Sequence, residues 1–101
     1  MNTIDLKNYS PIISDKTTGE KIYNEIKKNE PLNNKVTIDM SSIKSMATFC
    51  AKQIFGRLYI ELGSECFFKN IIIKGASDDV QSIIKLGIRF AVENEIKDLP
   101  Q

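Results

Sequence analysis

The amino-acid sequence predicts an α/β fold in which helices pack on a small mixed sheet that is largely parallel, in the order ββαβαβα. Short runs with the apolar periodicity of strands alternate with longer segments whose apolar residues recur at helical spacing. Strands that alternate with helices favour crossover connections and therefore parallel pairing. A chain of 101 residues, 42% of them hydrophobic, is long enough to form one core, so we expect a single domain over residues 1–101.

The N-terminal region predicts two short strands, at Thr3–Leu6 and Pro11–Ser14. The segment Lys7–Ser10 between them is expected to turn the chain, which would make the two strands a hairpin. Pro11 has no backbone N–H and therefore fits only at the start or the edge of a strand.

The first helix is predicted to begin at a capping box, Thr17 to Glu20, and to end at about Lys28. In such a box the threonine hydroxyl accepts a hydrogen bond from the backbone N–H of the glutamate, whose carboxylate reaches back. Pro31 follows and disfavours helical geometry in the residue before it. The buried face of this helix would consist of Ile22, Tyr23 and Ile26.

A strand that turns into a long helix occupies the centre of the sequence. Within Lys35–Met40, the apolar residues Val36, Ile38 and Met40 alternate with polar ones, which is the period of a strand with one buried face. The helix that follows is predicted from a single apolar stripe, which consists of Ala47, Ala51, Ile54, Leu58 and Leu62. The turn between the strand and the helix exposes the hydroxyl groups of Ser41, Ser42, Ser45 and Thr48.

The last part of the chain predicts one more strand and one more helix. Gly63 is a stop signal for the central helix, and the apolar run Asn70–Lys74 is typical of a strand covered on both faces. After a turn at Gly75–Ala76, Ser77 is a suitable N-cap. The apolar stripe of the final helix consists of Val80, Ile83, Ile84, Gly87, Ile88 and Ala91.

Composition excludes several classes of function. The net charge of +1, from 14 basic and 13 acidic residues, favours neither a nucleic acid nor a membrane as partner. The chain has no histidine, which excludes Ser-His and Cys-His catalysis and histidine metal sites. Cys50 and Cys66 would lie about 20 Å apart at ~1.5 Å per helical residue, too far for a disulfide. No apolar run suits a signal peptide or a membrane span, so we expect a cytoplasmic protein without a cofactor or metal.

The run Ile43–Phe49 (IKSMATF), followed by Ile54–Leu58 (IFGRL), resembles the strand-to-helix segment of STAS domains, the bacterial anti-sigma factor antagonists. It resembles more closely the STAS-like domains of unknown function, and the resemblance covers roughly residues 18–96. In the antagonists this turn reads Met-Asp-Ser-Ser-Gly, and a partner kinase, itself the anti-sigma factor, phosphorylates the first serine. Matching the methionine to Met46 places Ala47 on the aspartate and Thr48 on the phosphorylated serine. The hydroxyl is therefore kept and the carboxylate is not.

This resemblance implies a regulatory domain that binds a protein and has no catalytic residues of its own. The natural partner would be an ATP-binding protein of the histidine-kinase-like class, and Thr48 would be the residue that it phosphorylates. The ATP site would belong to the partner. The contact surface would be the turn Met40–Phe49 with the start of the central helix, and its partner-binding residues would be Ser42, Ser45, Met46, Ala47, Thr48 and Phe49.

The central helix has a second apolar side, formed by Phe49, Gly56 and Ile60 opposite the buried stripe. One explanation is that a partner covers this side. The other is that flanking helices of the same domain cover Phe49 and Ile60, while the small Gly56 permits close helix packing.

Two other functions fit the same sequence. A phage or mobile-element interaction protein would use the fold to mask a host factor, and neighbouring phage structural genes would favour it over a switch encoded beside a kinase-like ATPase. A small enzyme that uses Ser42, Ser45 or Cys50 would need a concave polar pocket near those residues. Cys50 lies close to the buried stripe, so we expect it to pack as a small hydrophobic residue.

Overall fold

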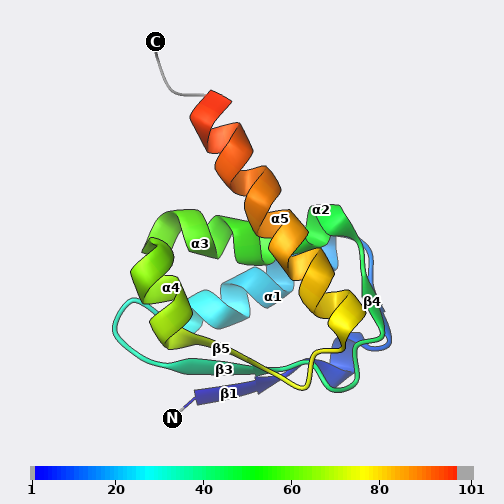
Figure 1. Ribbon diagram of the computed structural model, residues 1–101. Helices are drawn as coiled ribbons and strands as arrows, with labels where there is room; N and C mark the ends of the chain where they lie inside the picture. The colour runs from blue at the N-terminus through cyan, green and yellow to red at the C-terminus, as the bar shows by residue number, and fades with distance from the viewer. Residues whose placement is uncertain (1, 98–101) are drawn as a thin grey trace.

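The computed structural model describes residues 2–97, with side chains as far as residue 95; residues 1 and 98–101 of the expected domain lie outside it. Its main sheet contains β1 (Asn2–Asp5), β3 (Val36–Asp39) and β5 (Ile71–Lys74) in the order β1-β3-β5, and both pairs are parallel (Figure 1). The predicted α/β class with a small, largely parallel sheet is confirmed.

The expected N-terminal hairpin is wrong. The strand β2 (Ile12–Ile13) pairs with β4 (Ser45–Met46) in a separate two-stranded parallel sheet, whereas β1 pairs with β3. A short 3-10 helix, η1 (Leu6–Tyr9), lies between the first two strands. Each N-terminal strand therefore finds its partner in the middle of the chain, and β2 holds the segment that leads into the central helix.

The helices lie on one side of the main sheet (Figure 1). On that side Ile4, Ile38 and Ile71 are buried, whereas Ile72 is 37% exposed. The register aligns Ile72 with Thr37, whose side chain points to the same face because side chains alternate along a strand. The expectation that β5 is covered on both faces is therefore wrong, since Ile72 is exposed on the face away from the helices, although Thr37 of the central strand is only 9% exposed.

The first helix, α1 (Lys16–Lys28), begins two residues earlier than the predicted capping box implies. Its N-cap is Asp15, whose carboxylate accepts the backbone N–H of Thr18 at 2.7 Å and the Thr18 hydroxyl at 2.8 Å. Thr17 is therefore not the cap, because the aspartate two residues before it satisfies the free N–H of the first turn. The predicted buried face is confirmed: Ile22, Tyr23 and Ile26 are buried.

The central helix runs without interruption from Thr48 to Leu62, through α2 (Thr48–Ala51), a π-helical turn η2 (Lys52–Gly56) and α3 (Arg57–Leu62). Most of the predicted stripe is confirmed, since Ala51, Ile54 and Leu58 are fully buried, and Phe55 is buried with them. Gly63 ends the helix with a φ of +84°. A short helix that the sequence analysis did not predict, α4 (Ser64–Asn70), leads directly into β5.

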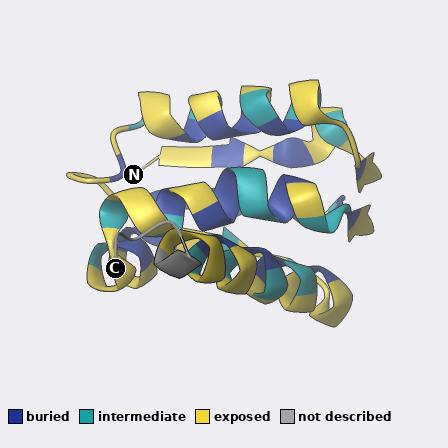
Figure 2. Ribbon diagram, turned by 90° about the horizontal axis from the view of Figure 1, so that it is seen from above, coloured by how far each residue is buried: buried dark blue, intermediate teal, exposed yellow. Residues whose placement is uncertain are grey.

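The last helix, α5 (Asp78–Lys97), begins at the predicted N-cap, because the Ser77 hydroxyl oxygen accepts the backbone N–H of Val80 at 3.2 Å. It crosses the central helix at two glycines, Gly56 and Gly87. A Cβ atom on Gly87 would lie 2.6 Å from the carbonyl carbon of Ala51, so the two backbones are in contact. Seen from above, the central helix lies between α1 and α5, and its buried residues face both (Figure 2).

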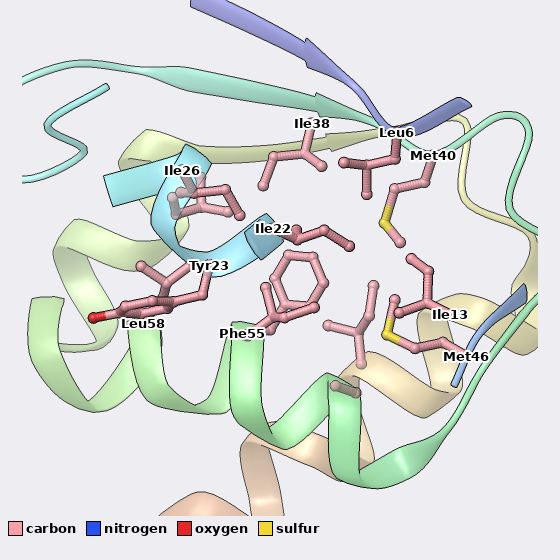
Figure 3. Close-up of a cluster of buried hydrophobic side chains, with 14 of the residues drawn as sticks. Leu6, Ile13, Ile22, Tyr23, Ile26, Ile38, Met40, Met46, Phe55 and Leu58 are labelled. Atoms are coloured by element: carbon pink, nitrogen blue, oxygen red, sulfur yellow. The ribbon is translucent and has the colours of Figure 1, made fainter. Parts of the chain in front are cut away.

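The core fills the space between the sheet and these three helices. Figure 3 shows side chains from the strands and loops, such as Ile38, Met40 and Met46, gathered around Phe55 of the central helix. No helix within residues 2–97 combines the length and the apolar character needed to span a bilayer. The packing fixes the central helix from both sides, and with it the residues at its start.

Candidate functional site

The turn that leaves β3 is held by a carboxylate that the sequence analysis did not single out. The backbone N–H of Ser41 donates to Asp39 Oδ1 at 2.9 Å, and the Ser41 hydroxyl donates to the same oxygen. The hydrogen bonds from Ser41 hold the pKa of the Asp39 carboxyl below its ordinary value. Gly75, with a φ of +74°, packs against Ser41, so the turn rests on the β5–α5 connection. An aspartate two residues before a serine at a strand end is the signal for such a turn.

The six predicted partner-binding residues lie at different depths. Met46 is only 2% exposed and belongs to the core (Figure 3), so its side chain anchors the segment. The Ser42 hydroxyl is buried and has no hydrogen-bond partner among the described residues. Ser45 is exposed in β4, opposite Ile12. Ala47 and Thr48 are half-buried, and Phe49 is 53% exposed.

The start of the central helix is fixed by the backbone of Ala47. Its N–H donates to the carbonyl of Ile13 at 2.8 Å, and its own carbonyl accepts from the N–H groups of Cys50 and Ala51 at 3.0 and 3.1 Å. Ala47 is the N-cap but its side chain makes no capping hydrogen bond. Thr48 is therefore the first helical residue, at an end where the helix dipole is positive.

The expected burial of Cys50 is confirmed, because its side chain is fully buried and its Sγ lies 3.5 Å from the carbonyl oxygen of Asp15. Burial raises the pKa of the Cys50 thiol, so the group stays protonated at neutral pH. Cys50 thus packs as a small apolar side chain.

A groove of about 600 Å³ runs along the exposed side of the central helix, between that helix and the far end of α5. Phe49 lies at one rim, and Ile60 along the same side is 37% exposed. The explanation by intramolecular packing is therefore confirmed for Gly56 and wrong for Phe49 and Ile60, and the cover by a partner stays a prediction. Gly56 does permit close packing of α5, but the flanking helices leave Phe49 and Ile60 exposed. The lining residues are Phe49, Lys52, Gln53, Arg57, Ile60, Glu61, Ala91, Asn94 and Glu95.

A polar network centred on Arg57 forms one wall of the groove. The guanidinium stacks 3.8 Å above the Tyr23 ring and pairs with Glu20 Oε2 at 3.2 Å and with Glu61 Oε2 at 3.8 Å. The Tyr23 hydroxyl donates to Glu61, and burial together with this bond raises the pKa of Tyr23 to about 12. These ion pairs are partly exposed and each contributes little stability. Their effect is to fix the orientation of Arg57 at the groove.

The groove brings together apolar and charged side chains but none of the candidate nucleophiles. Ser42, Ser45 and Cys50, the candidate nucleophiles, do not line the groove. Within residues 2–97, no three acidic, cysteine or histidine side chains gather where a metal ion would be held. The groove instead offers an exposed aromatic ring, an aliphatic side chain and charges of both signs.

A known protein family matches the part of the chain that includes the central helix, but not the far end of α5 that lines the groove. A family model described as a STAS-like domain of unknown function (DUF4325) matches residues 18–81, from α1 through the central helix and β5 to the first turn of α5. That match spans more than half of the chain. No match was found among curated proteins or among solved structures.

Proposed function

Because the chain belongs to the family of STAS-like domains, we propose that it is a regulatory domain that binds a protein partner through the start of the central helix and catalyses no reaction itself. The observation that supports this most is the exposure of Phe49, which is 53% accessible at the rim of a groove and adjacent in sequence to Thr48. A large aromatic side chain beside a groove is typical of the anchor residues of interfaces.

The partner that we propose is an ATP-binding protein of the histidine-kinase-like class, and Thr48 is the residue that it phosphorylates. Thr48 is half-buried and precedes the exposed Phe49 in the sequence, so a partner that covers Phe49 would lie next to Thr48. The support for Thr48 is the resemblance of the Met46–Phe49 turn to the phosphorylated turn of the antagonists.

Phosphorylation would oppose binding without unfolding the domain. A phosphate on Thr48 adds roughly −1.5 to −2 charges at the positive end of the helix dipole, one turn before Lys52, and both of these interactions favour the helix. The same charge beside Phe49 would have to leave water when an apolar interface forms, at a cost of at least several kcal/mol, because an ionised group is harder to desolvate than a neutral polar one. Affinity would therefore fall by well over tenfold.

Three variants test the switch. Partner captured from the native host is purified, and its affinity is measured for wild type, Thr48→Ala and Thr48→Glu. Thr17→Glu, which places the same charge in the first turn of α1, is the control. We expect wild-type affinity for Thr48→Ala and Thr17→Glu, and weaker binding for Thr48→Glu.

The same partner is then incubated with ATP and each protein, and phosphothreonine is located by mass spectrometry. We expect phosphate on Thr48 of the wild type and none on Thr48→Ala. Equal affinities in all four proteins, with no phosphate on Thr48, would remove the switch from the proposal.

A further inference from the structure

A second docking surface lies at the free edge of β5. We propose that this edge, together with the groove between β5 and α5, accepts an extended peptide segment as an added strand, with an apolar side chain in the groove and an acidic residue beside it. The proposal does not rest on the contact at Phe49, because the residues that line the two grooves are all different.

The backbone of β5 has unpaired groups on its outer side. Within residues 2–97, β5 pairs with β3 alone and is an edge of the sheet. The carbonyl of Lys74 accepts the N–H of Met40 at 2.8 Å, so Ile72 and Lys74 direct their peptide groups towards β3. These groups alternate in direction along a strand. The N–H and carbonyl of Ile73 and the carbonyl of Ile71 therefore face outwards. These are the groups that strand addition uses.

An apolar groove of about 310 Å³ adjoins this edge on the helix side of the sheet. Its floor is formed by Ile71 and Ile73 of β5, and Ile84 and Ile88 of α5 form the opposite wall. Phe68 also lines the groove and is 69% exposed. The ring packs edge-on against Phe67, with the centroids 5.4 Å apart, so this part of the groove is preformed.

The charge at the groove decides which occupant fits it. Among the described residues that line the groove, one is charged, and this is Lys85. Gln81 lies one turn before it on α5. A second copy of the chain would bring its own β5, which carries Lys74 at its end, towards this cation. An acidic segment with one apolar side chain complements both the groove and Lys85, so the occupant that we assign is an acidic, extended peptide of a partner.

The probe is an acetylated and amidated heptapeptide, Thr-Glu-Thr-Leu-Thr-Glu-Thr, titrated into the isotope-labelled full chain and followed by NMR. On an added strand the leucine and both glutamates share one face, so leucine enters the groove with glutamates on either side. We expect saturable shifts of the amides of Ile71, Ile73 and Lys85, and no shift of Phe49. Replacing the leucine with threonine is expected to weaken binding at least tenfold.

Two N-methylated peptides test strand addition itself. One is methylated on the leucine and both glutamates, and the other on the alternate residues. The N–H groups of alternate residues point to opposite sides of a strand, so only one of the two sets of N–H groups faces β5. The peptide methylated on that set is expected to lose at least tenfold in affinity, and the other peptide is expected to keep its affinity.

Protein variants test the charge. Lys85→Glu is expected to reverse the preference for the glutamate peptide over the same peptide with lysines, by about threefold or more. Lys21→Glu, an exposed lysine beside a different groove on α1, is expected to keep the original preference.

Three results would overturn the proposal. The first is an absence of shifts at about 1 mM peptide, where a dissociation constant of 1 mM, or about −4.1 kcal/mol, would half-saturate the protein. The second is equal affinity of both methylated peptides, which would show apolar binding without an added strand. The third is an unchanged charge preference in Lys85→Glu.

Discussion

Replacing Gly87 with alanine is expected to destabilise the domain, because α5 touches the backbone of the central helix at this residue. A Cβ atom on Gly87 would lie 2.6 Å from the carbonyl carbon of Ala51 and from the nitrogen of Lys52. Carbon atoms in van der Waals contact lie about 3.5–4.0 Å apart, so the helices would have to separate by roughly 1 Å.

The size of the effect follows from two opposing contributions. Overpacking costs typically ~1–3 kcal/mol, and the upper end applies because the atoms in the way belong to backbone. Alanine regains about 1 kcal/mol of helix propensity over glycine. We therefore expect the free energy of unfolding to fall by about 2 kcal/mol.

Urea unfolding of wild type and Gly87→Ala measures this difference, and at ~4–8 °C per kcal/mol the melting midpoint should fall by roughly 8–16 °C. Gly19→Ala is the matched control. The atoms within 3 Å of its added Cβ belong to the flexible side chain of Gln53, which can swing away. That variant is expected to keep a stability near wild type. If Gly87→Ala were as stable as Gly19→Ala, the backbone contact between the two helices would be refuted.

Three further predictions follow from individual side chains. Tyr23 is expected to titrate at about pH 12 instead of 10.0. Because folding raises its pKa, the contribution of the protonated Tyr23 to the free energy of unfolding is complete below pH 10 and is lost as the pH rises towards 12. An ultraviolet titration of wild type against Tyr23→Phe measures this, and an ordinary tyrosine curve would contradict it. Asp15→Ala is expected to lower the melting midpoint, whereas Thr17→Ala is not. Because hydrogen bonds from Thr18 lower the pKa of Asp15, the difference in midpoint between wild type and Asp15→Ala should disappear as the pH falls below 3.8. Melting curves between acid and neutral pH measure it, and equal midpoints at neutral pH would contradict the cap. Phe49→Ala is expected to cost less than about 1 kcal/mol in urea unfolding, against ~3–5 kcal/mol for Phe55→Ala, since Phe55 is fully buried and Phe49 is not. Similar losses in both would place Phe49 in the core.

Local patterns in the sequence were sufficient to predict most of the elements. The alternation of Val36, Ile38 and Met40 predicted β3, Ser77 predicted the start of α5, and Gly63 predicted the end of the central helix. Each of these signals acts over a few residues, where hydrogen bonds and side-chain direction are fixed by the backbone itself.

The parallel character of the sheet was predicted, but the partners of the two N-terminal strands were not, because these pairings depend on contacts between distant segments. Nothing within Ile12–Ile13 indicates that it pairs with Ser45–Met46 and not with β1. The helix α4 was missed although Glu65 in its first turn and Lys69 in its last suit the helix dipole. The π-helical turn has no signal in the sequence at all.

Of the candidate site, the sequence predicted the residues at the start of the central helix and not the groove beside them. The sequence placed Thr48 and Phe49 in the first turn of the central helix, as the structure has them. The groove beside them also needs Ala91, Asn94 and Glu95, which come from the far end of α5. Their proximity depends on the angle at which α5 crosses the central helix, and that angle is set by the contact between Gly56 and Gly87.

Amide hydrogen exchange of the domain alone and in complex with its captured partner tests the central claim most directly. We expect new protection over the start of the central helix and along the groove, at Thr48–Glu61 and near Ala91. The face of the sheet away from the helices, which carries Ile72, should exchange as in the free domain. Protection confined to that face, with Phe49 and its neighbours unchanged, would contradict binding through the start of the central helix.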